Sequence, residues 1–196
     1  MINFLYKNFS RSFQLFFLRI GLSKNNYKNF KDLNFKQNDF INYKIVKYYV
    51  LKNNFVKNIN IQDIHTFNFL FFYQKLGGKK GIELSKENIF LWFKKFKYYS
   101  KFPWSAEHAS KRFINLVYSY DFICSISHKK EIAQINKILN FHIKRISFEV
   151  GLKKADSISS SEILALVLIE CCKNSLNSKI MGKIENLVNI QIDENS

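Results

Sequence analysis

Turn-forming residues are scarce in this chain, and their scarcity limits the folds open to it. Its 196 residues include one proline and six glycines, too few for the many tight turns of a multi-stranded β fold. Hydrophobic residues make up 47% of the chain and charged residues 23%, a composition typical of globular rather than disordered proteins. The sequence therefore predicts an all-α domain with a sizeable buried core.

Apolar residues recur at helical spacing from residue 61 onward. We expect helices over about 62–76, 84–99, 106–126 and 130–150, a fifth containing 163–172, and a last one over 179–192. Gly77 and Gly78 should end the first helix, Ser85 should cap the second, and Ser159 or Ser160 should cap the fifth. Such helices joined by short loops are typical of antiparallel pairs. Periodicity leaves open whether the pairs stack as a superhelix or close into a toroid.

The first sixty residues have a different texture. Over residues 1–22, apolar side chains at helical spacing predict an amphipathic helix that packs on the domain or lies on a membrane surface. Residues 23–60 are rich in lysine and asparagine and are expected to form a loop-rich basic arm with one or two short strands. The helical domain proper is then predicted to cover residues 61–196.

The formal net charge is +16, because 31 lysines and arginines face 15 aspartates and glutamates. Lysine heavily outnumbers arginine, and asparagine, isoleucine, phenylalanine and tyrosine are also abundant, which is the bias that AT-rich codons produce. The charge is therefore either compositional or a functional surface for polyanions. Sulfated or uronate polysaccharides suit such a surface as well as nucleic acids do.

Neither the cysteines nor the apolar runs indicate a special class of protein. Cys124, Cys171 and Cys172 fit neither a disulfide framework nor a zinc motif, so we expect no metal site and no cofactor. The best apolar run, over residues 163–172, is well short of the roughly 20 residues that a bilayer requires. The N-terminal segment has no A-x-A cleavage motif. We expect no transmembrane helix and no cleavable signal peptide, and the compartment stays open between cytoplasm and periplasm.

Two segments carry a resemblance to a known family. Residues 64–78, IHTFNFLFFYQKLGG, resemble a helix with the pattern H-x-F-(D/N)-(W/F)-L that ends in a Gly-Gly stop. Residues 89–123 resemble a tryptophan-bearing helix, a P-x-W turn and a following helix with an R-(R/x)-(L/F)-(I/L)-N pattern; the matching residues are Trp92, Trp104, Arg112, Phe113, Ile114 and Asn115. In order and spacing, the chain resembles the N-terminal helical region of the bacterial heparinase II/III-like polysaccharide lyases.

The resemblance implies a fold and a substrate class. It implies the first half of an (α/α) toroid, from a bacterial protein whose β-sandwich domain is missing here. It also implies binding and β-eliminative cleavage of an acidic, uronate-containing polysaccharide. That reaction needs a group to neutralise the carboxylate, a base and an acid, and the family's residues for these roles map onto no position of this chain. Of the family's D-G-G-H motif, expected near residues 193–196, only Asp193 matches. We therefore expect a truncated chain with no catalytic residues and no lyase activity of its own.

Four residues are candidates for substrate binding. Trp104, His108 and Arg112 are spaced by four residues and could share one helix face that lines a sugar-binding groove, through ring stacking and carboxylate pairing. Asn115 joins them through the family motif. The alternative is structural: Trp104 lies in the core, Arg112 pairs with Glu107 or a helix end, and His108 is exposed.

Two other function classes compete with the lyase-like reading. A basic helical protein could bind nucleic acid or the ribosome, although the sequence contains no recognition-helix signature, no RNP motif and no arginine cluster. We therefore expect no specific nucleic-acid partner. A membrane-surface protein could make peripheral contact through residues 1–22.

Overall fold

The computed structural model describes residue 13 and residues 61–98, 101–172 and 178–193. Helices account for 82% of the described residues, and no strand occurs among them, so the all-α prediction is confirmed. The helices are α4 (Ile61–Thr66), α5 (Phe69–Leu76), α6 (Gly78–Phe96), α7 (Ala106–Tyr118), α8 (Tyr120–Cys124), α9 (Lys129–Gly151), α10 (Ser160–Cys171) and α11 (Ser178–Asp193), with a 3-10 turn η2 at Ala155–Ser157. Within this described part, no helix is both long and apolar enough to cross a membrane.

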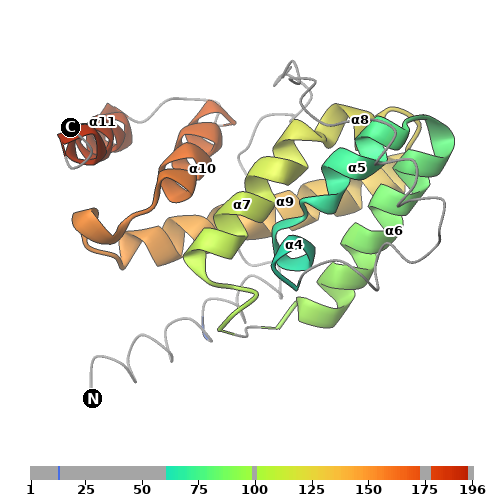
Figure 1. Cartoon of the computed structure of the whole chain (residues 1–196), viewed down its shortest axis with the longest axis horizontal. Coiled ribbons are helices and arrows are strands. Elements are labelled where there is room, and N and C mark those ends of the chain that lie inside the picture. Colours follow the sequence, from blue (N-terminus) through green and yellow to red (C-terminus); the bar gives the residue numbers. More distant parts are fainter. Residues whose placement is uncertain (1–12, 14–60, 99–100, 173–177, 194–196) are drawn as a thin grey trace.

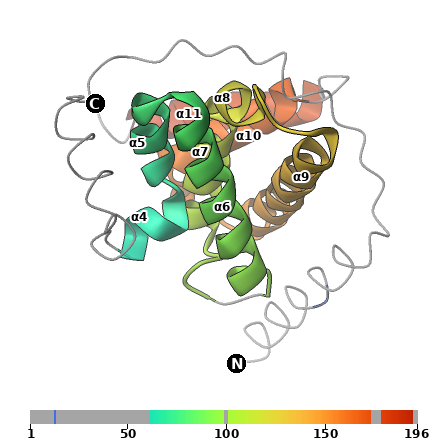
Figure 2. The ribbon, with the colours of Figure 1, turned by 90° about the vertical axis from the view of Figure 1, so that its right-hand side faces the viewer.

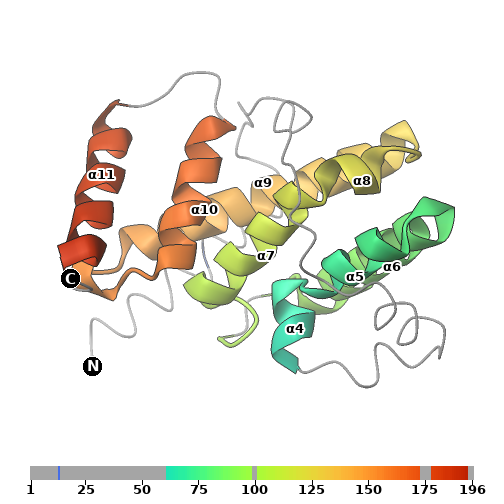
Figure 3. The same cartoon turned by 45° about the horizontal axis from the view of Figure 1, so that its top comes forward.

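Helix α9 spans much of the length of the domain (Figure 1). Helices α4, α5, α6 and α8 lie toward one end, and α10 and α11 lie toward the other (Figure 3). Helix α7 packs against α9, α10 and α4. The core is continuous, with fully buried side chains such as Phe113 and Leu116 on α7 and Ile135 and Leu139 on α9.

Side-chain contacts give the directions of the neighbouring helices. Arg112 on α7 binds His142 on α9, and Tyr120 on α8 binds Asn136, nearer the start of α9. Helices α7 and α8 therefore run antiparallel to α9. Helix α6 runs parallel to α9 instead, and long side chains bridge the two helices. The Nζ of Lys86 on α6 lies 2.9 Å from the Glu131 carboxylate on α9. Further along both helices, the ring centres of Phe93 on α6 and Phe141 on α9 lie 5.5 Å apart. The view in Figure 2 shows α9 set apart from α6. Closure into a toroid stays a prediction.

Several predicted boundaries match the structure. Leu76 ends α5, and the backbone N–H of Gly77 caps it by donating to the Tyr73 carbonyl. Helix α9 covers the predicted 130–150 with one extra residue at each end. Ser159 is the N-cap of α10, and the Glu162 carboxylate accepts a hydrogen bond of 2.9 Å from the Ser159 backbone N–H, which completes one half of a capping box.

Three helix predictions were wrong in detail. The expected helix over 62–76 is broken into α4 and α5, because Phe67 adopts a φ of 61°. The expected helix over 106–126 is broken at Ser119 into α7 and α8. Ser85 does not cap a helix: α6 already begins at Gly78, and the Ser85 hydroxyl donates to the Gly81 carbonyl at 2.8 Å. The helix predicted over residues 1–22 and the strands predicted within 23–60 lie outside the described residues, apart from Phe13, which is helical.

Gly81 marks the closest approach of α6 to its neighbours. A Cβ atom there would overlap the Tyr73 carbonyl and lie 3.1 Å from the Phe122 ring. We expect Gly81→Ala to lower the free energy of unfolding by about 1–3 kcal/mol, the usual cost of overpacking. The matched control is Gly182→Ala on α11, where a Cβ meets nothing within 4 Å and alanine should stabilise the helix by about 0.5–1 kcal/mol. Urea unfolding of both variants tests this, and equal effects of the two substitutions would contradict it.

Candidate polyanion-binding site

The structure places Trp104 in the turn before α7 rather than on the helix itself. Helix α7 begins at Ala106 with Ser105 as its N-cap, so the predicted common helix face of Trp104, His108 and Arg112 does not form. The three residues nevertheless lie close together, because the turn folds the indole of Trp104 back over the helix. The guanidinium carbon of Arg112 lies 4.8 Å from the Trp104 ring centre. Both side chains are fully buried.

Arg112 lies at the centre of a buried polar cluster. Its Nε donates to His142 Nε2 at 2.7 Å, and its Nη1 donates to the backbone carbonyl of His65. The guanidinium carbon also stacks 3.9 Å from the centre of the Trp92 ring. Nη2 has no hydrogen-bond partner within the described part of the chain. The alternative that Arg112 pairs with Glu107 does not hold, because Glu107 pairs with Lys111 on the surface.

A buried guanidinium without a carboxylate partner needs another source of negative charge. The end of α4 supplies part of it, since the last carbonyls of a helix are unpaired and carry the negative end of the helix dipole. Arg112 binds the carbonyl of His65, near that end. Charged hydrogen bonds of this kind contribute about 1.5–3 kcal/mol each. A desolvated cation over an indole adds about 2 kcal/mol. Arg112 therefore holds α4, α6 and α9 against α7.

Asn115, one helical turn further along α7, is also buried and binds the backbone where the helix is interrupted between α4 and α5. Its Nδ2 donates to the Thr66 carbonyl at 2.8 Å and to Asn68 Oδ1 at 2.9 Å. These bonds stabilise the backbone on both sides of Phe67, whose positive φ interrupts the predicted helix. Trp104, Arg112 and Asn115 thus have no open surface in this structure. Their substrate-binding role stays a prediction and is not part of the function proposed below.

Two buried histidines complete the cluster. His65 Nδ1 accepts a hydrogen bond from Trp92 Nε1 at 3.0 Å. Burial, followed by the charge of Arg112, lowers the pKa of His65 to about 4. His142 Nδ1 lies 2.8 Å from the Ile138 carbonyl, to which it donates, while its Nε2 accepts from Arg112. Burial and the same positive charge lower the pKa of His142 well below its usual range. Both rings therefore serve as neutral hydrogen-bond partners.

His108 is the one predicted site residue that reaches the surface. Its Nδ1 lies 2.7 Å from the Ser105 hydroxyl and 3.1 Å from the Phe102 carbonyl, and the Ser105 hydroxyl accepts from the His108 backbone N–H. Burial lowers its pKa. No carboxylate orients the imidazole among the described residues, so the Ser105–His108 contact lacks the third group of a hydrolytic triad. The pair caps α7 and holds the preceding turn.

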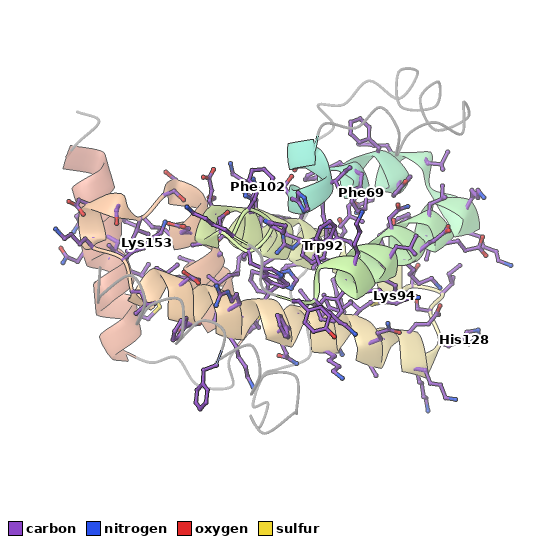
Figure 4. The ribbon with its side chains drawn as sticks, turned by 90° about the horizontal axis from the view of Figure 1, so that it is seen from below. Phe69, Trp92, Lys94, Phe102, His128 and Lys153 are labelled. Carbon is purple, nitrogen blue, oxygen red and sulfur yellow. The ribbon has the colours of Figure 1, made fainter. Side chains whose placement is uncertain are left out.

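Above this cluster lies a set of lysines and exposed aromatic rings, which we call the basic–aromatic surface. It comprises Lys94, Lys95, Lys97, Tyr98, Lys101 and Phe102. Tyr98 is 55% exposed and Phe102 47%, although large aromatic rings are usually buried. The Phe102 ring also contacts the rings of His108, at 4.6 Å, and His65, at 5.5 Å. Phe102 therefore connects this set of residues to the buried cluster; Figure 4 labels Phe102 and Trp92.

The lysines of the basic–aromatic surface form no ion pair with a described residue, although Lys95 and Lys97 lie 5.4 and 5.2 Å from the ring centres of Phe96 and Tyr98. None of the four forms an ion pair within the described part of the chain, where the paired lysines are Lys79, Lys86, Lys111 and Lys153. A purely structural role explains two of these lysines. Lys94 and Lys95 occupy the last turn of α6, where cations interact favourably with the helix dipole. It does not explain Lys101 or the exposed rings.

The sequence does contain a feature that indicates this surface, an interval rich in lysine and free of acidic residues. No acidic residue occurs between Glu87 and Glu107, although four lysines do. The arginines behave differently: Arg112 and Arg145, the two in the described part of the chain, are both fully buried. Lysine alone therefore carries the positive surface charge of the described helices.

Comparison with known proteins adds no relative: no family model, no curated protein and no solved structure matches this chain. Within the described residues, no group of three or more histidine, cysteine, aspartate or glutamate side chains could hold a metal ion. What the described residues offer is a set of lysine charges beside two exposed aromatic rings. This arrangement assigns no reaction.

Proposed function

We propose that this chain is a binding module for acidic polysaccharides and that the basic–aromatic surface is its site. The observation that carries the proposal is the combination, within residues 94–102, of two exposed rings and four lysines that form no ion pair with a described residue. Lysine ammonium groups attract sulfate or carboxylate groups along a polymer. The flat apolar face of a sugar ring can pack on Tyr98 or Phe102, as apolar ligand faces commonly do on aromatic rings.

Two considerations favour a polysaccharide over a nucleic acid. Phosphate recognition commonly uses the bidentate fork of arginine, and both arginines in the described part of the chain are buried. The resemblance of residues 64–78 and 89–123 to heparinase-like proteins points to the same substrate class. The second segment contains the whole basic–aromatic surface.

The test compares two variants that lose the same charge. In the first, Lys94, Lys95, Lys97 and Lys101 are replaced by glutamine; in the second, the replaced residues are Lys79, Lys80, Lys111 and Lys154, which are exposed elsewhere. Each exposed ionic contact contributes about 0.2–1 kcal/mol. We therefore expect the first variant to bind a heparin-type polysaccharide roughly tenfold more weakly or worse, and the control to lose less than about threefold. Isothermal titration calorimetry at several salt concentrations measures both.

Further ligands and one more variant separate charge from stacking. Tyr98→Ala should weaken binding without changing its salt dependence, because the ring contributes no ion contact. A neutral dextran should not bind. Equal losses in the two glutamine variants would show non-specific attraction by net charge. Tighter binding of a charge-matched oligonucleotide than of the polysaccharide would assign the surface to nucleic acid instead.

A further inference from the structure

A row of lysines runs along α9, away from the basic–aromatic surface. Lys130, Lys137 and Lys144 follow one another at intervals of seven residues, which places them on one side of the helix at steps of about 10 Å. Lys130 and Lys137 are exposed. Neither forms an ion pair within the described part of the chain.

The carboxylates near this row are already engaged. Helix α9 has no acidic residue between Glu131 and Glu149. Glu131 accepts two hydrogen bonds from Lys86, at 2.9 and 3.0 Å, and one from the His128 backbone N–H. Glu149 pairs with the buried Arg145. Among the described residues, no acidic side chain of α9 therefore offsets the charge of Lys130 or Lys137.

Two side-chain contacts between α6 and α9 connect the row to the basic–aromatic surface. The Lys86–Glu131 and Phe93–Phe141 contacts show that the two helices run in the same direction. Lys97 follows Phe93 by four residues and Lys144 follows Phe141 by three, so both lysines come after the same contact. Figure 4 labels His128 at the start of α9 and Lys94 on α6. From Lys130 to the level of Lys144 the helix rises about 21 Å.

We propose that Lys130 and Lys137, with Lys144 at the junction, continue the polyanion site along α9, so that the protein binds long acidic polysaccharide chains more tightly than short ones. This inference rests on the proposed function of the basic–aromatic surface. A fragment shorter than about 20 Å fills that surface alone, whereas a longer chain also reaches the row. Each added lysine contact releases further counterions and so steepens the salt dependence of binding.

The experiment uses size-fractionated oligosaccharides of one sulfated polysaccharide, shorter and longer than about 20 Å, with the full chain. For the wild type we expect the long fragment to bind at least fivefold more tightly than the short one. The double variant Lys130→Gln/Lys137→Gln should lose this gain and show a shallower salt dependence with the long fragment, while its affinity for the short fragment stays within twofold. The control Lys111→Gln/Lys154→Gln, with the same charge loss, should keep the gain.

The outcomes separate this inference from the proposal on which it rests. If both fragments bind equally, or if the double variant keeps the gain from length, the α9 row is not part of the site, and the basic–aromatic surface stands. If the control loses the gain as well, length dependence reflects net charge, and the row is again excluded. If neither fragment binds the wild type, the proposed function fails, and this inference fails with it.

Discussion

Arg112→Ala is expected to lower the free energy of unfolding by about 2–5 kcal/mol, because it truncates a large buried side chain and leaves buried hydrogen-bond acceptors without a donor. The truncation leaves His142 Nε2 and the His65 carbonyl without their donor. It also opens a cavity beside Trp92 and Trp104, since the guanidinium carbon lies 3.9 and 4.8 Å from the centres of their rings. Urea unfolding followed by tryptophan fluorescence measures the change, since the guanidinium stacks directly on Trp92.

Two further variants show what the guanidinium contributes. Arg112→Lys should recover only part of the loss, because an ammonium group cannot reproduce the planar fork that reaches His142 and the end of α4 together. Lys111→Ala, at the neighbouring exposed position, should change the free energy of unfolding by less than about 1 kcal/mol, since it breaks only a surface ion pair with Glu107. Polysaccharide affinity of folded Arg112 variants should stay near that of the wild type. An unchanged stability with a tenfold weaker affinity would instead support the groove role predicted from the sequence.

The helices that the sequence predicted well are those whose ends depend on local chemistry. The end of α5 at Gly77 and the start of α10 at Ser159 follow from capping within a few residues. The breaks at Phe67 and Ser119 depend on distant parts of the chain. Asn115 reaches back 49 residues to the Thr66 carbonyl and thereby stabilises a backbone turn that the apolar periodicity conceals. Tertiary hydrogen bonds of this kind override a helical pattern that is otherwise continuous.

The candidate site was predictable in a similar, partial way. Spacing brought Trp104, His108 and Arg112 together as a group, and the structure does place them in contact. Spacing could not show that two of the three are buried, because burial of Arg112 depends on α4, α6 and α9 closing around it. The acid-free interval before Glu107 is visible in the sequence itself. Whether this interval is exposed is known only from the structure, because a run of Phe, Tyr and Trp among lysines is equally compatible with a buried position in the core.

Acidification should destabilise the fold well above the pH at which its carboxylates titrate. The pKa of His65 in the folded protein is about 4, against an ordinary value of 6.5, and complete burial lowers the pKa of His142 well below the same ordinary value. Below pH 6.5 the unfolded chain binds more protons at these two residues than the folded one, so stability falls as the pH falls from about 6.5 toward 4. At pH 5 the titration of His65 should have cost about 2 kcal/mol relative to pH 7, at about 1.4 kcal/mol per pH unit. His142 should add a further loss in the same direction.

Replacing one buried histidine by a side chain that does not titrate isolates this effect. In His142→Gln, the amide oxygen can take the place of Nε2 and accept from Arg112 Nε, so the loss between pH 7 and pH 5 should be smaller than in the wild type and approach the contribution of about 2 kcal/mol from His65. His128→Asn, at the exposed start of α9, should retain the full wild-type loss. Urea unfolding at intervals from pH 7.5 to 5 stays above the range in which Glu107 and Glu131 protonate, because lysine hydrogen bonds lower the pKa of both carboxyls below 4.5. A loss that is as large in His142→Gln as in the wild type would show that other groups titrate in this window and that the buried histidines do not control it.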